Sequence, residues 1–546
     1  MPRFEFGAGV GDFVVQPSDG LWAVGAGATV TFWSAAADGA QYTDLLDASS
    51  SPISQVTSDE YGSLPRFSGP PDVSGMWADG GGGTRAWMDA HSLSAGYVGS
   101  VRDWRNVMDY EAAGDGVTDD APAIQAALDE CPRGGIVYLP ALTFGTLTPI
   151  RIPPYVTLMG CHGAGEVQPG APAPVTSLKP LAGFTGTAVI EIVDQQLGGY
   201  SILASQQRIE RLTVDGAAVP DEVHVDGIRM TGQIQNPIIR DVGLRDMTGA
   251  GINTEYNFTA PPGPQAPFCI HMERVSVMWS QGIGVILNNS TDSNLSDVYV
   301  LGCASFGWWI SGSGNSTLTA CRSEWSGMEG YRITIGPGVL RLIGCSTDRS
   351  NGHGINVSGT DPGFLVLSNC ALTRDGKWFG GGGGGQAGLN VENAACSVIA
   401  DGLIITPEAD DDGGGAQSPQ YGVRLLNAAY TSIGSGTVAG TSAGVVDAGG
   451  NGPIIRGERL REAKGPSTAL VTIPRQGTVT LNGTTPVVVP TEAVKAGSQI
   501  MLTTQAPGGT PGTPYVASRI VGASFSAQST SASDTSTAAW HLRDPA

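Results

Sequence analysis

Two acidic residues, Glu324 and Asp348, stand at the same position of two successive copies of a short sequence repeat. If each copy forms one turn of a solenoid, both side chains face outward on adjacent rungs, about 4.8 Å apart. Carboxyl groups about 5 Å apart suit a retaining glycosidase, whereas a wider pair suits an inverting one. The proximity of like charges raises one pKa, which leaves an acid beside a base. The pattern predicts that Glu324 and Asp348 are the acid and the base or nucleophile of a glycan-cleaving site.

Other residues of the same repeats are candidates to complete this site. Glu329 and His353 occupy equivalent turn positions of two repeats, and we expect them to shape or tune the carboxyl pair. Exposed Trp faces are suited to binding sugar rings, and an Arg flanks the pair. The predicted glycan-binding residues are Trp279, Trp309, Trp325, Trp378 and Arg349. The alternative for the charged residues is a solvated position on the outer face, without a role in catalysis.

Neither a metal site nor a phosphate-binding loop is predicted. The acidic run at residues 410–412 lies in a Gly-rich stretch, and we expect a solvated loop there, with a cation site as the alternative. The Gly run at 380–385 is predicted to be a flexible loop over the solenoid face, because no P-loop Lys-Ser/Thr follows it. The eight Cys contain no CxxC pair and no Cys/His cluster with metal-ligand spacing. We therefore expect no metal and no cofactor.

The element that must position these residues is the repeat itself. In five segments a small apolar residue or Cys is followed nine residues later by a Gly that opens an apolar stretch. The pairs are Val242/Gly251, Val275/Gly284, Val298/Gly307, Cys321/Gly330 and Cys345/Gly354. The last four copies recur at about 23 residues, which is about one β-helix turn. A unit this short cannot bury an apolar face alone, so it must stack on its neighbours.

Inside each copy, apolar or small residues alternate with other residues, as at Val298/Val300 and Trp308/Ile310. Period two is typical of strands with one buried face. Neither ten-residue helical stripes nor the Leu/Asn framework of a leucine-rich repeat is present. We therefore predict an all-β fold with a right-handed parallel β-helix over residues of about 130 to 460. The five reference residues of the repeat, from Val242 to Cys345, form one inward stack in this prediction.

Composition agrees with strands and turns and narrows the partners. The chain has 546 residues, with Gly 80, Pro 35 and 14% charged residues, which does not fit a helical bundle. A net charge of −21 argues against nucleic acid and anionic membrane surfaces as partners. We recognise neither a signal peptide nor an apolar stretch of transmembrane length, so membrane insertion is not expected.

The chain is predicted to have three regions. Residues 1–100 hold short β-like runs and turn clusters, 101–464 form the β-helix, and 465–546 form a second β-rich domain. A helix at about 119–131 carries Ile124, Ala127, Leu128 and Cys131 on one stripe, with Thr118, Asp119 and Asp120 as N-cap oxygens. An amphipathic helix before the first strands is suited to capping the open end of a solenoid.

Specific motifs now suggest a family. Residues 114–128, followed by 134–140, resemble the opening motif of the pectate-lyase-like superfamily, which includes many bacteriophage tailspikes and polysaccharide depolymerases. Residues 11–90 and 497–540 are similar to modules of minor tail proteins from phages of actinobacteria. The resemblance implies an N-terminal tail-attachment domain and a C-terminal tip or trimerisation domain. It also implies a homotrimer in the virion, made in the host cytoplasm.

What the resemblance implies about function leaves three roles open. The first is a tailspike or minor tail protein that recognises and depolymerises host cell-surface polysaccharide, as a hydrolase or as a lyase. The second is a non-catalytic receptor-binding adhesin, and the third is a structural tail component; in each, phage tail or baseplate proteins are partners. Two carboxylates with Trp faces favour the first role, whereas Trp faces alone favour the second.

Overall fold

The computed structural model describes residues 3–7, 14–18, 21–90, 104–162, 175–193, 204–255, 266–378, 381–382 and 385–543. The chain divides into two compact units, Met1–Trp104 and Arg105–Ala546. The first unit has one apolar core, and the second has two. Half of the Gly run at 380–385, which was predicted to be a flexible loop, lies outside the described residues.

The first unit consists of small antiparallel sheets around a core of Phe6, Phe32 and Phe67. One sheet contains β1 (Arg3–Phe6), β6 (Leu45–Asp47), β7 (Pro52–Ile53) and β9 (Phe67–Pro71). The other contains β4 (Thr29–Trp33), β5 (Gln41–Tyr42), β8 (Val56–Thr57), β10 (Gly75–Asp79) and β11 (Ala86–Asp89). A hairpin of β2 (Val15–Ser18) and β3 (Leu21–Val24) is also present. The prediction of a small β-rich N-terminal domain is confirmed.

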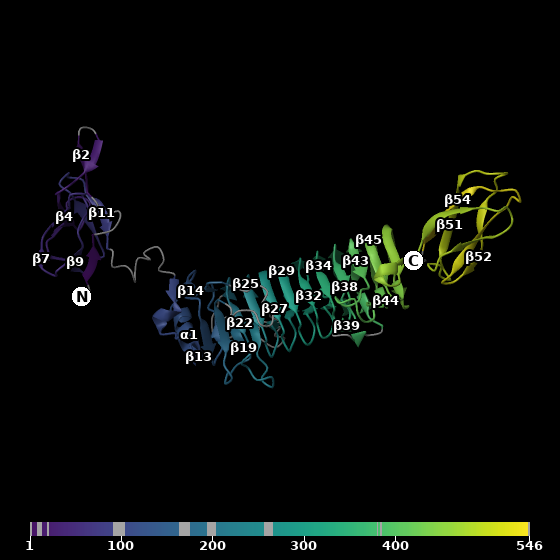
Figure 1. Ribbon diagram of the computed structural model, residues 1–546, viewed down its shortest axis with the longest axis horizontal. Coiled ribbons are helices and arrows are strands. Elements are labelled where there is room, and N and C mark those ends of the chain that lie inside the picture. Colours follow the sequence, from purple (N-terminus) through teal and green to yellow (C-terminus); the bar gives the residue numbers. More distant parts are fainter. Residues whose placement is uncertain are drawn as a thin grey trace. The chain divides into compact units, whose positions relative to one another are not determined.

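The second unit begins with β12 (Trp104–Asn106), the 3-10 helix η1 (Val107–Tyr110) and α1 (Ala121–Asp129) (Figure 1). The α1 face that carries Ile124, Ala127 and Leu128 is buried against the first turns of the solenoid, so the predicted capping helix is confirmed. Asp120 does not cap the helix with its side chain. Its carboxylate instead accepts hydrogen bonds from the backbone N–H groups of Ala113 and Gly114, at 2.6 and 3.2 Å.

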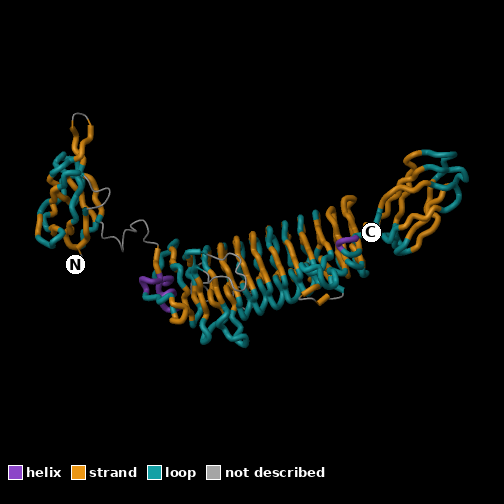
Figure 2. The backbone as a smooth tube through the Cα atoms, in the orientation of Figure 1, coloured by secondary structure: helices purple, strands orange, loops and turns teal. Residues whose placement is uncertain are grey.

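The central part of the second unit is a parallel β-helix, as predicted (Figures 1 and 2). Each turn contributes three strand segments, which stack on those of the next turn to form three walls. In the turn at residues 294–311, Asn294–Ser296 belong to wall 1, Val298–Leu301 to wall 2 and Trp308–Ser311 to wall 3. A left-handed residue, here Asp297 with φ 51°, turns the chain between walls 1 and 2.

Walls 1 and 2 together form a 22-stranded sheet, which also includes β12 and β48 (Val471–Thr472). Strands of wall 1 are β14 (Ile136–Leu139), β17 (Thr157–Gly160), β21 (Arg208–Glu210), β31 (Thr317–Thr319), β34 (Val339–Ile343), β37 (Phe364–Ser368) and β42 (Ser397–Asp401). Strands of wall 2 are β13 (Asp115–Asp119), β15 (Thr143–Thr146), β18 (Ser177–Pro180), β22 (Thr213–Asp215), β32 (Arg322–Glu324), β35 (Ser346–Asp348), β38 (Ala371–Thr373) and β43 (Leu403–Thr406). Strands that run through both are β25 (Ile238–Arg245), β27 (His271–Met278), β29 (Asn294–Leu301), β45 (Tyr430–Gly440) and β47 (Ile454–Lys464).

Wall 3 is an 11-stranded sheet. Its strands are β16 (Ile150–Arg151), β19 (Ala188–Val193), β23 (Asp226–Thr231), β26 (Ile252–Glu255), β28 (Val285–Asn288), β30 (Trp308–Ser311), β33 (Tyr331–Thr334), β36 (Ile355–Gly359), β41 (Ala387–Ala394), β44 (Tyr421–Leu426) and β46 (Ala443–Asp447). Two short pairs lie apart from the walls, namely β20 (Ala204–Ser205) with β24 (Ile234–Gln235) and β39 (Lys377–Trp378) with β40 (Gly381–Gly382).

The inward stack has the predicted register. Val242 pairs with Val275, and Val275 with Val298. The pairs Tyr299–Arg322 and Arg322–Ser346 carry the same register on to Cys321 and Cys345, and all five stack members are buried. Cys370 extends the stack; its thiol donates to the carbonyl of Leu342 at 3.4 Å, and burial raises its pKa to about 12. All eight cysteines are free thiols.

The C-terminal part of the second unit has its own core of Phe525 and Trp540, whose rings meet edge-on at 5.3 Å. One three-stranded antiparallel sheet contains β49 (Gln476–Thr480), β51 (Gln499–Ala506) and β54 (Thr537–Arg543). The other contains β50 (Val487–Pro490), β52 (Pro514–Ile520) and β53 (Ser524–Ser529). The short η2 (Ser467–Ala469) and β48 connect them to the β-helix. Among the described residues, no helix has the length and hydropathy needed to cross a membrane.

Candidate functional site

The outward ladder of wall 2 brings Glu324 and Asp348 side by side. They are paired residues of β32 and β35, on strands that are direct neighbours in the sheet. The full ladder reads Asp215, Arg245, Met278, Leu301, Glu324, Asp348, Thr373 and Thr406. Glu324 and Asp348 are therefore adjacent carboxylates on one face, about one strand spacing apart.

The two carboxylates have different partners. Glu324 Oε2 accepts a hydrogen bond from the Tyr299 hydroxyl at 2.8 Å, and the Arg322 guanidinium lies over the Tyr299 ring. Asp348 is held by Arg374 in a two-pronged ion pair, with Nε of Arg374 2.7 Å from Oδ1 and Nη2 bonded to Oδ2. A bidentate pair of this kind is among the stronger charge-assisted contacts. Both oxygens of Asp348 are thus engaged by the protein itself.

An aromatic edge lies next to this ladder. The residues that follow successive wall-2 strands all adopt the left-handed conformation, and they are Asp246, Trp279, Gly302, Trp325, Arg349 and Arg374. The Trp279 and Trp325 rings meet edge to face, with centroids 6.2 Å apart. Gly302 lies in the rung between them, and a Cβ there would overlap the Trp279 ring. The Arg349 guanidinium lies 5.3 Å from the Trp325 ring centroid.

The acidic loop at residues 410–412 covers part of this edge. Asp411 forms ion pairs with Arg349, at 3.1 Å, and with Arg374. Asp410 lies 3.4 Å from the ammonium of Lys377, whose side chain is only 1% exposed. Asp411 is 68% exposed, as expected of a solvated loop, but the ion pairs of Asp410 and Asp411 with protein cations were not expected. Asp348 belongs to the same network, because it also pairs with Arg374. The network joins three carboxylate side chains to three cationic side chains.

Glu329 and His353 make their contacts toward wall 3. Glu329 Oε1 accepts from Nδ2 of Asn356 at 2.9 Å and lies 3.7 Å from Arg332. Nδ1 of His353 accepts the backbone N–H of Ala387 at 2.9 Å. Burial lowers the His353 pKa, and nearby Glu329 partly opposes this. A neutral ring that accepts through Nδ1 carries its proton on Nε2, so His353 presents a donor there.

A polar ladder on wall 3 continues from these two residues, and sequence reasoning missed it. Asn356 Oδ1 accepts from Asn390 at 2.9 Å, Asn390 Oδ1 accepts from Arg424 at 2.9 Å, and Arg424 donates to Glu392 at 3.0 Å. The signal was present in the repeat. The outward position two residues after the repeat Gly reads Asn253, Ile286, Trp309, Arg332, Asn356, Asn390 and Arg424 along the stacked strands.

The predicted Trp residues are divided between two walls. Trp279 and Trp325 share the edge of wall 2, whereas Trp309 lies on wall 3, 38% exposed and paired with Arg332. The backbone of Trp378 belongs to β39, but its side chain lies outside the described residues. In the part of the chain that the structure describes, no group of three His, Cys, Asp or Glu residues is arranged to hold a metal ion.

Family models match two parts of the chain. The family model of rhamnogalacturonase A/epimerase, pectate lyase-like, matches residues 104–324. The part of the β-helix up to Glu324 is therefore similar to the pectate-lyase-like family. A second family model, the C-terminal domain of K1 capsule-specific polysaccharide lyase, matches residues 469–543. The pectate-lyase-like match ends at Glu324 and so includes Trp279 and Tyr299, but not Asp348, Arg349 or most of the wall-3 polar ladder.

The chain is similar to curated relatives over short stretches. Alginate lyase 7 of Azotobacter vinelandii is 34% identical over 139 residues, which is 24% of this chain and 14% of the relative. Mannuronan C5-epimerase AlgE3 of the same bacterium is 32% identical over 161 residues, 27% of this chain and 8% of the relative. The chain thus spans a small part of the length of these relatives.

Solved structures to which the chain is similar include both phage and bacterial proteins. Tailspike protein 2 from an Escherichia coli O157:H7 bacteriophage has a TM-score of 0.48 and 14% identity, over 80% of this chain and 59% of that chain. The Dettilon tailspike protein has 0.42 and 11%, over 81% and 95%. The AlgE4 A-module of the A. vinelandii mannuronan C-5 epimerase has 0.41 and 17%, over 66% and 96%.

The β-helix thus presents two separate polar surfaces. Wall 2 offers adjacent carboxylates beside an aromatic edge, which is a combination suited to sugar rings and to acid–base chemistry. The wall-3 ladder offers alternating amide, guanidinium and carboxylate groups, which are suited to hydrogen bonding with hydroxyls. The Glu324–Asp348 pair combines ionisable groups with Trp rings, and it is therefore the stronger candidate for chemistry.

Proposed function

We propose that this chain is a phage tail protein, of the tailspike or minor-tail type, that binds host cell-surface polysaccharide. The observation that carries the proposal is the edge of wall 2, where Trp279, Trp325 and Arg349 lie beside the Glu324–Asp348 pair. Both matching family models are named for enzymes that act on polysaccharides, which supports this substrate class. In this proposal the first unit attaches the protein to tail or baseplate proteins of the virion.

The geometry of the edge suits a polymer that lies across several rungs. The two Trp side chains are partly buried and contact each other, so little side-chain freedom is lost on binding. Sugar rings present apolar C–H faces to such rings, while their hydroxyls meet the guanidinium of Arg349 and the carboxylate of Glu324. Binding therefore combines aromatic contact with directed hydrogen bonds.

We further propose that Glu324 and Asp348 cleave the bound glycan. Glu324 is the acid, positioned by the Tyr299 hydroxyl, and Asp348 is the base or nucleophile, positioned by Arg374. Their backbones are paired on adjacent strands, about one strand spacing apart, which is compatible with the short carboxyl separation of a retaining mechanism. Glu329 and His353 make their hydrogen bonds with residues of wall 3, so this proposal gives them no direct contact with the carboxyl pair.

One observation favours a second candidate, a non-catalytic adhesin. Both oxygens of Asp348 are bonded to Arg374, which also binds Asp411 of the covering loop. An aspartate used to hold a loop in place is unavailable to a substrate unless the loop moves. In that case the Trp edge binds glycan and no bond is broken.

A single experiment separates these roles. Purified full-length protein is applied to an array of bacterial surface glycans, and the bound polysaccharide is then incubated with the protein and assayed for new reducing ends. Binding with release supports the depolymerase, and binding without release supports the adhesin. The absorbance of unsaturated uronate ends then distinguishes a lyase from a hydrolase. Absence of binding to any surface glycan contradicts the proposed function.

A further inference from the structure

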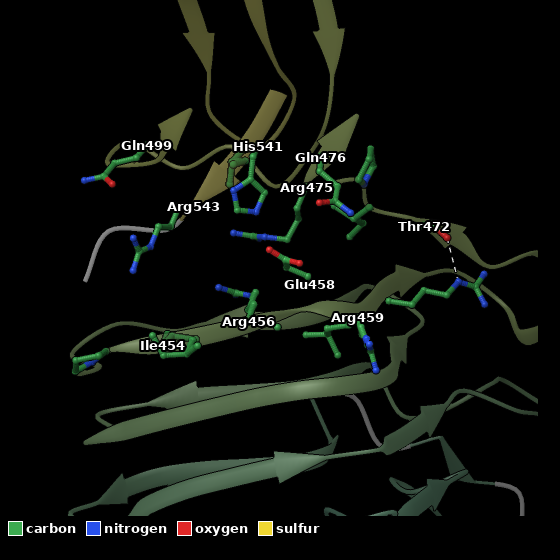
Figure 3. Close-up of a pocket in the computed structure, with 18 residues that line it drawn as sticks. Ile454, Arg456, Glu458, Arg459, Thr472, Arg475, Gln476, Gln499, His541 and Arg543 are labelled. Carbon is green, nitrogen blue, oxygen red and sulfur yellow. Dashed lines mark hydrogen bonds between the residues drawn. The ribbon is translucent and has the colours of Figure 1, made fainter. Parts of the chain in front are cut away.

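Arginine side chains gather at two places in the second unit, and the exposure of their acidic partners differs between them. One place is a pocket beside β47 and the C-terminal sheets, where the Glu458 carboxylate lies between Arg456 and Arg475 (Figure 3). Glu462, whose side chain is 8% exposed, lies 3.5 Å and 3.8 Å from the same two arginines. A ligand would have to displace a buried acid there. The other place is the edge of wall 2, where the acidic partner is exposed.

At the edge of wall 2, one carboxylate of the acidic loop joins two guanidinium groups. Oδ1 of Asp411 pairs with Nη1 of Arg374, and Oδ2 lies 3.1 Å from Nη2 of Arg349. The two arginine side chains are each 16% exposed, whereas the Asp411 side chain is 68% exposed. The arginines are therefore fixed parts of the edge, and the carboxylate that joins them lies at the surface.

Both arginines also have a second acidic partner, which keeps them in place. Arg374 is held by both oxygens of Asp348, and Arg349 lies 3.6 Å from Oδ1 of Asp410. Asp410 is 22% exposed and is itself placed by the ammonium of Lys377, 3.4 Å away. A guanidinium group has five N–H donors, so each arginine can bind a further carboxylate at the same time.

An external carboxylate can therefore replace the Asp411 carboxylate one for one. When the exposed Asp411 side chain turns into water, two ion pairs at the surface are broken, and pairs of this kind contribute little to stability. An incoming carboxylate restores the charge balance and the contacts, with one oxygen on each guanidinium group. Because the Arg349 guanidinium lies 5.3 Å from the Trp325 ring centroid, the sugar that carries this carboxylate lies next to the aromatic edge.

We propose that Arg349 and Arg374 form a subsite for a carboxylate-bearing sugar, such as a uronic-acid unit, and that Asp411 occupies this subsite when no glycan is bound. The inference rests on the proposed function, since it names the class of glycan that the edge of wall 2 selects. Asp411 is an internal competitor in this arrangement. A neutral sugar has no group that replaces its carboxylate, so the subsite favours acidic polymers.

Binding to the full chain is measured by calorimetry at fixed salt with three probes, namely oligogalacturonate, its fully methyl-esterified neutral form and poly(glycerol phosphate). Asp411→Asn removes the internal competitor, and we expect it to bind oligogalacturonate about tenfold more tightly, which corresponds to one charge-assisted hydrogen bond. Asp412→Asn is the matched control. It removes the same charge from the next residue, which is exposed and accepts the backbone N–H of Gly414. Its affinity should equal that of the unaltered protein.

Arg349→Gln tests the subsite from the side of the cation. We expect it to bind oligogalacturonate about tenfold more weakly and to leave binding of the methyl ester unchanged. In the Arg349→Gln background, Asp411→Asn should increase the affinity less than it does in the unaltered protein, because the two substitutions remove the same contact. The comparison of Asp411→Asn with Asp412→Asn uses two exposed positions, so it stands even where Arg349→Gln lowers stability.

Each result supports or overturns the subsite. Preference for oligogalacturonate over its methyl ester, with a gain in affinity confined to Asp411→Asn, supports it. The inference is overturned if the methyl ester binds as tightly as the acid, if poly(glycerol phosphate) binds in place of oligogalacturonate, or if the Asp411 and Asp412 variants change the affinity equally. A protein that binds a neutral surface glycan but not oligogalacturonate would retain the proposed function and lose this inference.

Discussion

At the scale of single residues, position in the ladder and chemical role are separate matters. Glu324 and Asp348 occupy equivalent outward positions, yet a hydroxyl group donates to Glu324 and a guanidinium group pairs with Asp348. The repeat predicts where each Cβ points, because strand register is a backbone property. It does not predict that Arg374 pairs with both Asp348 and Asp411, because long side chains from other turns and loops make those contacts.

If the chain cleaves glycan, Glu324→Gln and Asp348→Asn each lower the rate of reducing-end release by about 10²–10⁴-fold, with binding retained. The amides keep the shape and remove the ionisable group. Asp215→Asn is the matched control, since Asp215 stands on the same ladder and pairs with Arg245. Full activity in both site variants would place the chemistry elsewhere, whereas loss in the control would point to damage of the sheet.

Asp375 predicts a specific pH dependence of stability. It is fully buried, accepts from the Thr347 hydroxyl at 2.6 Å, and burial raises its pKa to about 8. In the unfolded chain an Asp side chain has a pKa of about 3.9. Between these values the unfolded chain releases a proton that the folded chain keeps, so this residue's contribution to the free energy of unfolding falls by about 1.4 kcal/mol per pH unit. Below about pH 4 that contribution is fully present, and it levels off above about pH 8.

The test compares melting temperatures of the unaltered protein and Asp375→Asn from pH 4 to pH 8. Because Asn does not titrate, we expect the variant to gain stability relative to the unaltered protein as pH rises. Asp361→Asn, at an exposed position, should follow the unaltered protein throughout. Parallel pH profiles for Asp375→Asn and the unaltered protein would show that Asp375 does not carry a raised pKa.

At the scale of elements, the strand-and-turn repeat was predictable and the surface between repeats was less so. The nine-residue interval from Val298 to Gly307 specifies the wall-2 and wall-3 strands of a turn, because alternating burial fixes the strand face and the Gly position lacks room for a Cβ. The wall-3 polar ladder followed from the same register, but Asn356 and Asn390 carry no charge that would draw attention. The ion pairs of the acidic loop were not predicted, because its partners are distant in sequence.

The packing of the aromatic edge depends on Gly302. Its φ of +67° is strained for other residues, and a Cβ would overlap the Trp279 ring. Gly302→Ala should therefore lower the melting temperature and weaken glycan binding. Gly344→Ala is the matched control, with φ +61° and open space around the added Cβ.

The control isolates the cost of the left-handed backbone, about 1–2 kcal/mol. We expect Gly302→Ala to lower the free energy of unfolding by about 1–3 kcal/mol more than the control, because the added Cβ overpacks the site. Thermal or denaturant unfolding measures this difference. Only Gly302→Ala should impair binding of the polysaccharide selected on the array. Equal stability and equal binding of the two variants would mean that Trp279 does not depend on the space above Gly302.

At the scale of the whole molecule, the proposed assembly concerns surfaces that one chain leaves exposed. The C-terminal sheets expose several large apolar side chains, and they are Val488, Met501, Tyr515, Ile520 and Val521. Exposed apolar side chains gathered on one small domain are typical of an interface. A cyclic trimer closes on itself and so covers such a surface without open-ended association. These residues support the proposed homotrimer and its location in the region from 465 onward.

Light scattering at micromolar concentration should accordingly give about three times the chain mass of 56.0 kDa. Val488→Glu/Ile520→Glu places charges on two strands of the exposed apolar surface, and we expect it to shift the mass toward 56.0 kDa, because charge burial at an interface is costly. Val117→Glu is the control, since Val117 is exposed on β13 of the β-helix and lies outside the C-terminal region. It should remain trimeric. A monomeric mass for the unaltered protein would contradict the trimer. If the double variant stays trimeric, the interface lies along the β-helix. A glycan groove between subunits then becomes the site to examine.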